Sequence, residues 1–189
     1  MRENIVRAFI AIDLDPGTKE TLQALVGELR TACADIRWVN AEGMHLTLKF
    51  LGTIDDDQGL RVKRILTDIT RRHAPFALGL ERTGAFPDEM RPRVLWVGFA
   101  GASELSTLQE EIDRALEAEG FEREKRAFAP HLTLGRVKGP DRIPQAMAML
   151  ARHREESFGA MTVRKVTLFE SILHPEGAEY RAVFEAGLS

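Results

Sequence analysis

Cysteine is nearly absent from this chain of 189 residues, with Cys33 as its single example. One cysteine cannot form an internal disulfide, so the sequence excludes the disulfide-stapled class of small secreted domains and does not imply an oxidising compartment. No histidine stands near Cys33 in the sequence to activate its thiol. We therefore expect a small buried side chain at this position and not a catalytic nucleophile.

Long apolar runs are also missing. The N-terminal run is interrupted by Arg7 and ends at Asp13, which is too short for a secretory signal, and no stretch approaches the length of a membrane span. We expect a cytoplasmic protein that does not associate with membranes.

The chain has no large excess of charge of one sign. Its formal net charge is −3, which argues against a protein that grips long nucleic acids by neutralising many phosphates. Any contact with nucleic acid should therefore be local. Three short basic clusters lie among acidic or apolar residues and read as solvated surface: Arg61 to Arg64, Arg71 with Arg72, and Arg123 to Arg126.

Several familiar signatures of enzyme chemistry are lacking. The sequence has no Walker loop, no dinucleotide-binding glycine turn and no G-x-S-x-G elbow, and it has neither H-E-x-x-H nor H-x-H. The consecutive carboxylates Asp55, Asp56 and Asp57 fit the start of a helix, where they cap free N–H groups, better than a metal site. We predict neither a metal nor a cofactor, with metal binding by strand histidines as the weaker alternative.

The sequence does contain a repeated tetrapeptide, His45-Leu46-Thr47-Leu48 and His131-Leu132-Thr133-Leu134. Identity over four residues can arise by chance, but a repeat with His and Thr on one face is rarer than one of common helix residues. Strict alternation predicts half-buried strands, with the leucines in a core and His and Thr on the opposite face. Two such strands can present two imidazoles and two hydroxyls to one cleft.

Hydrophobic periodicity predicts an α+β chain with the order strand, helix, strand, strand, helix, strand, roughly repeated in the second half. Because no linker rich in Pro, Gly or Ser separates the halves, we expect residues 1–189 to form one compact unit of two pseudo-equivalent lobes, each with one His-x-Thr strand. The predicted strands are 5–14, 36–39, 45–50, 76–82, 94–99, 131–134, 160–171 and 180–185, and the predicted helices are 19–32, 58–72, 103–119 and 144–153.

Two histidines in one cleft suit an acid and a base near neutral pH, as needed for displacement at phosphorus. Thr47 and Thr133, together with Arg136 just beyond the second motif, would hold the phosphate oxygens where negative charge develops. A single half-buried histidine is more often structural, so periodicity alone leaves that reading open. His73, His153 and His174 lie at predicted helix ends or in a turn, where we expect exposed side chains.

The chain resembles the two-histidine phosphoesterases, whose signature is a pair of His-x-Thr/Ser motifs. It is most similar to the bacterial and archaeal RNA 2′,3′-cyclic phosphodiesterases, historically called 2′-5′ RNA ligases. The resemblance spans nearly the whole chain, and no signature position departs from it. It rests on R-A-F-I-A-I-D-L at 7–14, R-W-V-N-A-E-G-M-H-L-T-L-K-F-L-G at 37–52, R-P-R-V-L-W-V-G at 91–98, F-A-P-H-L-T-L-G-R at 128–136 and L-F-E-S-I-L-H-P-E-G-A-E-Y at 168–180.

This resemblance implies a bilobal fold, in which two antiparallel sheets face each other across a central cleft with helices outside, and a reaction without a metal. The implied reaction opens a terminal 2′,3′-cyclic phosphate on RNA or a nucleotide to leave a 2′-phosphate. The same pair of histidines would also catalyse a weak, reversible 2′-5′ ligation of a cyclic end to a 5′ hydroxyl. It implies His45 as the acid for the departing 3′ oxygen, His131 as the base, and Thr47, Thr133 and Arg136 as phosphate ligands.

Base recognition and substrate choice are less fixed. Phe9 is a candidate to stack on the terminal base, although a core position is the stronger reading, and Trp38 and Trp96 fit core or lobe packing. We expect a monomer that acts on RNA 3′ ends. The alternatives are a phosphodiesterase for 2′-5′ oligonucleotides or a cyclic ADP-ribose phosphate, and a non-catalytic module that binds phosphorylated RNA ends.

Overall fold

The computed structural model describes residues 5–32, 35–174 and 177–189. Cys33 and the centre of the predicted turn after His174 lie outside these residues. The described part contains four α-helices and nine strands in two antiparallel sheets, which confirms the predicted α+β class. No helix in it is long and apolar enough to cross a membrane.

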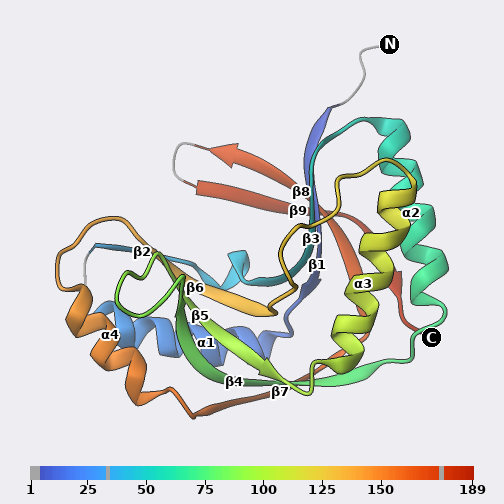
Figure 1. The fold of residues 1–189 in the computed structure, drawn as a ribbon. Coiled ribbons are helices and arrows are strands. Elements are labelled where there is room, and N and C mark those ends of the chain that lie inside the picture. The colour runs from blue at the N-terminus through green and yellow to red at the C-terminus, as the bar shows by residue number, and fades with distance from the viewer. Residues whose placement is uncertain (1–4, 33–34, 175–176) are drawn as a thin grey trace.

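The strands divide into a four-stranded and a five-stranded sheet, called sheet A and sheet B, which together enclose an angle (Figure 1). Sheet A has the order β3 (His45–Ile54), β1 (Val6–Asp13), β8 (Lys165–His174) and β9 (Gly177–Gly187). Sheet B has the order β2 (Ile36–Trp38), β6 (His131–Val137), β5 (Val94–Ala100), β4 (Phe76–Phe86) and β7 (Ser157–Val163).

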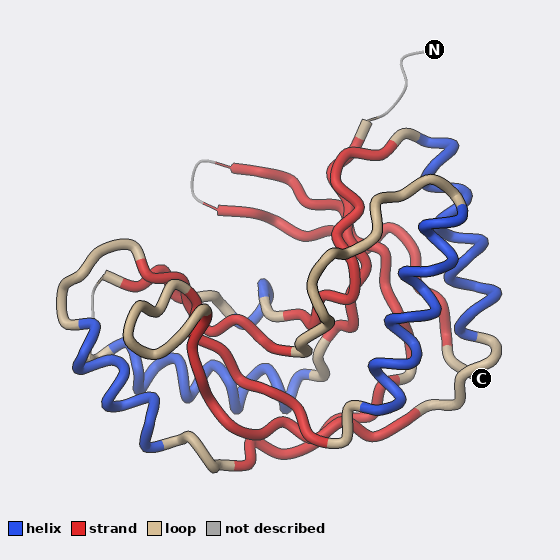
Figure 2. The backbone as a smooth tube through the Cα atoms, in the orientation of Figure 1, coloured by secondary structure: helices blue, strands red, loops and turns tan. Residues whose placement is uncertain are grey.

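Helices cover the outer faces of both sheets, as predicted (Figure 2). Helices α2 (Asp56–Thr70) and α3 (Ser103–Ala118) contact each other and pack on sheet A, whereas α1 (Pro16–Arg30) and α4 (Ile143–Arg152) contact each other and pack on sheet B. A short 3₁₀ helix, η1 (Ala41–Gly43), precedes β3. Asp55 forms a capping box with Gln58 at the start of α2, so the acidic run there begins a helix, as predicted.

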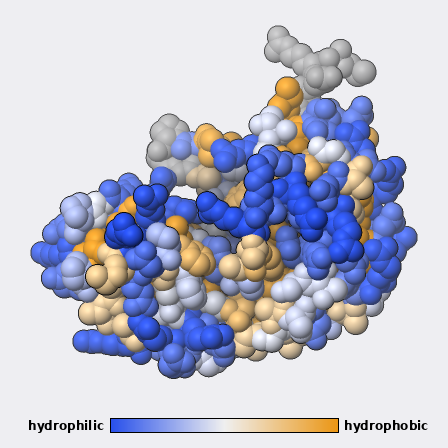
Figure 3. Space-filling model, viewed as in Figure 1, coloured by the Kyte–Doolittle hydropathy of each residue, from blue (hydrophilic) through white to orange (hydrophobic). Residues whose placement is uncertain are grey.

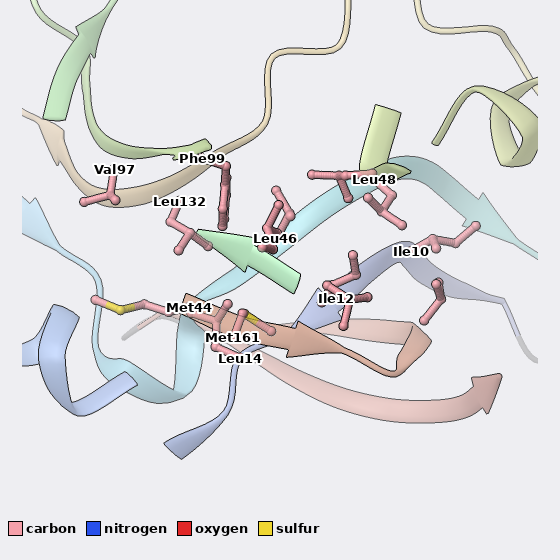
Figure 4. Packing of buried hydrophobic residues seen from close by; sticks show 14 of the residues in the cluster. Ile10, Ile12, Leu14, Met44, Leu46, Leu48, Val97, Phe99, Leu132 and Met161 are labelled. Carbon is pink, nitrogen blue, oxygen red and sulfur yellow. The ribbon is translucent and has the colours of Figure 1, made fainter. Parts of the chain in front are cut away.

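One hydrophobic cluster runs through both sheets and all four helices. It takes every second residue of the central strands, including Ile10 and Ile12 of β1, and the paired leucines of both His-x-Thr strands. Figure 4 shows Leu46 of sheet A and Leu132 of sheet B packed in the same region. The two motif strands therefore share a core although they belong to different sheets.

The two sheets each contain one His-x-Thr strand, but they do not correspond to the two halves of the sequence. Sheet A combines the first strands of the chain with the last two, and sheet B takes strands from both halves. Helix α1 follows a strand of sheet A but packs on sheet B, and α3 makes the reverse crossing. The repeat therefore reflects two similar strands, one in each sheet, and not two consecutive folding units.

The prediction of a single strand over 160–171 is wrong. The chain forms two strands there, β7 in sheet B and β8 in sheet A, and it passes from one sheet to the other at Arg164. Residues such as Val163 and Val166 are fully buried on both sides of this crossing. Continuous burial hides the break, because hydrophobic pattern reports burial and not which sheet a residue joins.

Candidate active site

The two His-x-Thr motifs lie on β3 of sheet A and β6 of sheet B, and the Cα atoms of these strands approach within 8 Å of each other. Leu46, Leu48, Leu132 and Leu134 are all in the shared core, so the His and Thr side chains face away from it. Figure 3 shows the surface hollowed between the parts of the molecule formed by the two sheets. We refer to this hollow as the cleft.

His45 is enclosed by aromatic rings. The edge of Tyr180 meets it at a centroid distance of 4.8 Å, and Phe9 lies 4.7 Å away. Burial is the main cause that lowers the pKa of His45 to about 4. The Asp13 carboxylate and a hydrogen bond with the Gly43 backbone act to raise the pKa, whereas the Lys19 ammonium lowers it further. Asp13 is the register partner of His45 on β1. The unliganded protein therefore holds a neutral imidazole here at pH 7.

His131 has a matching local environment. Its Nδ1 lies 2.8 Å from the carbonyl oxygen of Ala129, and because a carbonyl only accepts, Nδ1 donates the hydrogen. The rings of Phe86 and His131 meet edge-on at a centroid distance of 4.9 Å, and the centroids of Phe86 and Trp96 are 5.3 Å apart. Each histidine thus bonds to the backbone two residues before it and meets one aromatic ring edge-on. This arrangement leaves Nε2 of neutral His131 as a proton acceptor.

The three predicted phosphate ligands are uncommitted. Thr47 pairs with Ala11 and Thr133 with Trp96 in the sheet registers. Arg136 is exposed two residues beyond the second motif and pairs with Val94. Within the described residues, their side chains make no hydrogen bond or ion pair with the protein. Two hydroxyls and one guanidinium are therefore available to bind an anion.

Phe9 does not offer the exposed ring that the stacking hypothesis requires. Its exposed fraction is 2%, because Phe169 stacks on it at 5.3 Å while His45 and Tyr180 cover other sides. Together with Ala11 these rings form a second, small apolar cluster on the cleft face of sheet A. The hypothesis is corrected accordingly: Phe9 supports His45, and its ring is too deeply covered to receive a base.

Sequence reasoning missed the residues that surround the histidines. Tyr180, Phe86 and Trp96 come from strands distant in sequence, and only the sheet registers bring them to the motifs. Trp96 packs, as expected, but on the cleft face, where its indole lies over Gly84 and Gly98. Asp13, beside His45, carried no signal apart from ending the first strand.

The other histidines lie outside this constellation, each beside a carboxylate. His73 lies 3.4 Å from Glu111, His153 lies 3.1 Å from Glu28, and His174 lies 3.0 Å from Glu179. No group of three or more His, Cys, Asp or Glu side chains able to hold a metal occurs within 5–32, 35–174 and 177–189.

A family model described as the 2′-5′ RNA ligase superfamily matches residues 11–173, which include both motifs and Arg136. The chain belongs to this superfamily. The resemblance to two-histidine phosphoesterases that the motifs indicate is thereby confirmed.

Curated relatives and solved structures agree with membership of the 2′-5′ RNA ligase superfamily. The RNA 2′,3′-cyclic phosphodiesterase of Methanothermobacter thermautotrophicus is 34% identical over 93% of this chain and 95% of its own length. That of Archaeoglobus fulgidus is 36% identical over 95% of this chain and 100% of its own length. The crystal structure of TT0787 of Thermus thermophilus superposes with a TM-score of 0.81 at 27% identity, covering 96% of this chain and 97% of that one.

Proposed function

We propose that the protein is an RNA 2′,3′-cyclic phosphodiesterase, which opens the terminal cyclic phosphate of RNA to a 2′-phosphate. The proposal rests on the two His-x-Thr motifs, which lie on neighbouring strands with their His and Thr side chains facing away from the core. Arg136 lies just beyond the second motif, and the hydroxyls of both threonines bond to no other described residue. The names of the curated relatives support the same reaction.

The reaction needs one proton removed from water and one delivered to the departing 3′ oxygen. Nε2 of His131 takes the proton from water, because Nδ1 is already engaged with Ala129. His45 delivers the other proton. Because its pKa is about 4 in the free protein, its protonation depends on the substrate: an anionic phosphate beside the imidazole favours the charged form and raises the pKa.

Thr47, Thr133 and Arg136 bind the non-bridging oxygens, where negative charge grows as the bond to the leaving oxygen breaks. Arg136 suits this role because a guanidinium is always charged and binds two oxygens at once. The same residues keep the same roles when a 5′ hydroxyl takes the place of water: His131 removes its proton, His45 protonates the departing 3′ oxygen, and a 2′-5′ linkage forms at low rate.

In this proposal the protein works as a monomer, because one chain supplies both motifs. It works in the cytoplasm, because a chain with a single cysteine has no internal disulfide that would require an oxidising compartment. Light scattering after size exclusion tests the first point, and a mass of two chains at micromolar concentration would contradict it.

Turnover of a 2′,3′-cyclic-ended RNA in the presence of a chelator tests the function. The wild type should release only the 2′-phosphate, and His45→Ala and His131→Ala should each lose roughly 10²-fold or more. His73→Ala is the matched control, because His73 lies at the end of α2 beside Glu111, and it should retain full activity. Absence of 2′-phosphate with the wild type would refute the proposal, and undiminished activity in both motif variants would refute the site.

A further inference from the structure

An exposed aromatic ring lies on the same face as His45. Phe50 of β3 is 66% exposed, although its neighbours Leu48 and Lys49 are buried. Its ring lies 6.0 Å from that of Phe9, and Phe9 is 4.7 Å from His45. Phe50 therefore belongs to the cleft face of sheet A, separated from the catalytic imidazole by one buried ring.

An irregularity in the strand brings Phe50 to this face. Thr47 pairs with Ala11, Lys49 with Ile10 and Phe50 with Phe9, so β3 carries an extra residue at Leu48 relative to β1. A second extra residue follows at Leu51, because Gly52 pairs with Ala8. Regular alternation from His45 would have turned position 50 into the core. The extra residue shifts the alternation by one and turns Phe50 outward instead.

The second motif strand, β6, has the same irregularity in its pairing. Thr133 pairs with Trp96 and Gly135 with Leu95, so β6 carries one extra residue at Leu134. Arg136 therefore stands at the same offset from His131 as Phe50 does from His45. One sheet presents a phosphate ligand at this position, and the other presents an exposed ring.

A cation lies beyond Phe50 on the same face. Arg7 stands two residues before Phe9 on β1, so both point to the same side of sheet A. It is exposed and pairs across the sheet with Thr53. Within 5–32, 35–174 and 177–189, its guanidinium makes no ion pair or hydrogen bond. The face thus runs from His45 past Phe9 to an exposed ring and then to this guanidinium.

We propose that Phe50 and Arg7 form a subsite for the RNA strand on the 5′ side of the cyclic phosphate. The inference rests on the proposed function: because the reacting phosphate is the 3′ terminus, the rest of the RNA must leave the site in the 5′ direction. A nucleobase of the adjoining strand stacks on Phe50, and a backbone phosphate binds Arg7. An exposed ring beside a cation is the combination that proteins use for single strands without regard to sequence.

The charge of the molecule favours this occupant over a second copy of the chain. Arg7 offers a positive charge that no described residue neutralises, and the net charge of −3 means that two copies repel each other overall. RNA supplies both the π-face and the phosphate that the two residues lack.

The test compares two substrates, a 2′,3′-cyclic-ended pentanucleotide and a 2′,3′-cyclic mononucleotide. Phe50→Ala should lower kcat/KM on the pentanucleotide roughly 5- to 100-fold, as expected for one lost base stack, and should leave the mononucleotide within about twofold. Phe50→Trp should retain activity on both substrates.

Arg7→Gln should lower kcat/KM only on the pentanucleotide and should flatten the salt dependence of the KM for that substrate. Leu60→Ala is the control, an exposed apolar residue of α2, and should change neither.

Equilibrium binding separates failure of this inference from failure of the proposed function. Fluorescence anisotropy with a labelled RNA pentanucleotide ending in a 2′-phosphate requires no turnover, and Phe50→Ala should weaken its binding by a similar factor. If the wild type shows no turnover but Phe50→Ala still binds the RNA more weakly than the wild type, the proposed reaction is refuted and the subsite is supported. Equal binding by wild type and Phe50→Ala, equal losses on both substrates, or a change from dimer to monomer in Phe50→Ala overturns the subsite.

Discussion

Lys49 and Asp113 form a buried ion pair that connects the first motif strand to helix α3. The Lys49 ammonium donates to the Asp113 carboxylate at 2.5 Å, with 3% and 8% of the two side chains exposed. It also donates to the carbonyl of Glu122, at the start of the segment that leads to His131. One ammonium thus joins the strand of the first histidine to the approach to the second.

Removal of this ammonium should be costly. Lys49→Met leaves the Asp113 carboxylate buried without its main partner, since Arg123 reaches it only from the surface at 3.5 Å. We expect the free energy of unfolding in urea to fall by about 3–5 kcal/mol. The double variant Lys49→Met/Asp113→Leu should recover most of the loss, because it removes the unpaired charge. A loss below about 1 kcal/mol for the single variant would show that the pair is dispensable.

The depressed pKa of His45 is open to direct measurement. Titration of the ring proton by NMR in the unliganded protein should give a value of about 4 for His45. Tyr180→Ala should raise this pKa, because removal of the ring that meets His45 edge-on lets water reach the imidazole. Asp13→Asn should lower it further, because it removes the carboxylate that favours the charged form. A titration near the ordinary value of about 6.5 in the wild type would contradict the burial argument.

The alternating pattern of the motif strands predicted a large part of the site. Leu46, Leu48, Leu132 and Leu134 lie in the core as expected, and this alone fixes the side on which the histidines and threonines lie. Of the two readings of Phe9, the buried position is confirmed, and the stacking role is wrong for a specific reason. Phe9 is covered by rings from β8 and β9, whereas Phe50 is exposed through an extra residue that exists only relative to its partner strand.

The order of helices and strands along the sequence does not reveal which strands share a sheet. The chain crosses between the sheets several times, and its local pattern is the same whether the next element stays in one sheet or changes to the other. The equal offset of Phe50 and Arg136 from their histidines was visible in the sequence. Alone it carried no meaning, because strict alternation would have turned both positions into the core.

Gly84 allows the indole of Trp96 to lie close over the backbone of β4, next to Phe86, which contacts His131. A Cβ at position 84 would come within 2.3 Å of the indole, so Gly84→Ala forces Trp96 to move, and with it Phe86, whose ring touches His131. We expect a loss of about 1–3 kcal/mol in unfolding free energy, a shift in tryptophan fluorescence and reduced turnover.

Gly27→Ala is the matched control for this substitution. Nothing described lies within 4 Å of a Cβ at Gly27, which is exposed inside helix α1. Alanine should stabilise the protein there by about 0.5–1 kcal/mol without altering fluorescence or turnover. Equal effects of the two substitutions would mean that contact with Trp96 is not the cause.

His153 should stabilise the protein in a pH-dependent manner. It ends helix α4 and is hydrogen-bonded to Glu156 and, at 3.1 Å, to Glu28 of α1. Partial burial lowers the pKa of His153, but the two carboxylates outweigh it and raise the pKa above its ordinary value. A raised pKa means that the folded state binds the proton more tightly than the unfolded chain. The stabilisation is therefore complete below the unfolded pKa of about 6.5 and is lost as the pH rises through the folded value.

His153→Gln should accordingly cost about 1 kcal/mol at pH 5.5 and much less at pH 9, measured as the difference from wild type in urea unfolding at each pH. The magnitude is modest because both carboxylates are about half exposed, at 48% for Glu28 and 50% for Glu156. His174→Gln is the control: His174 and its partner Glu179 are 48% and 63% exposed, so its loss should be small at both values. A cost for His153→Gln that is equal at pH 5.5 and pH 9 would mean that the side chain acts through packing and not through its charge.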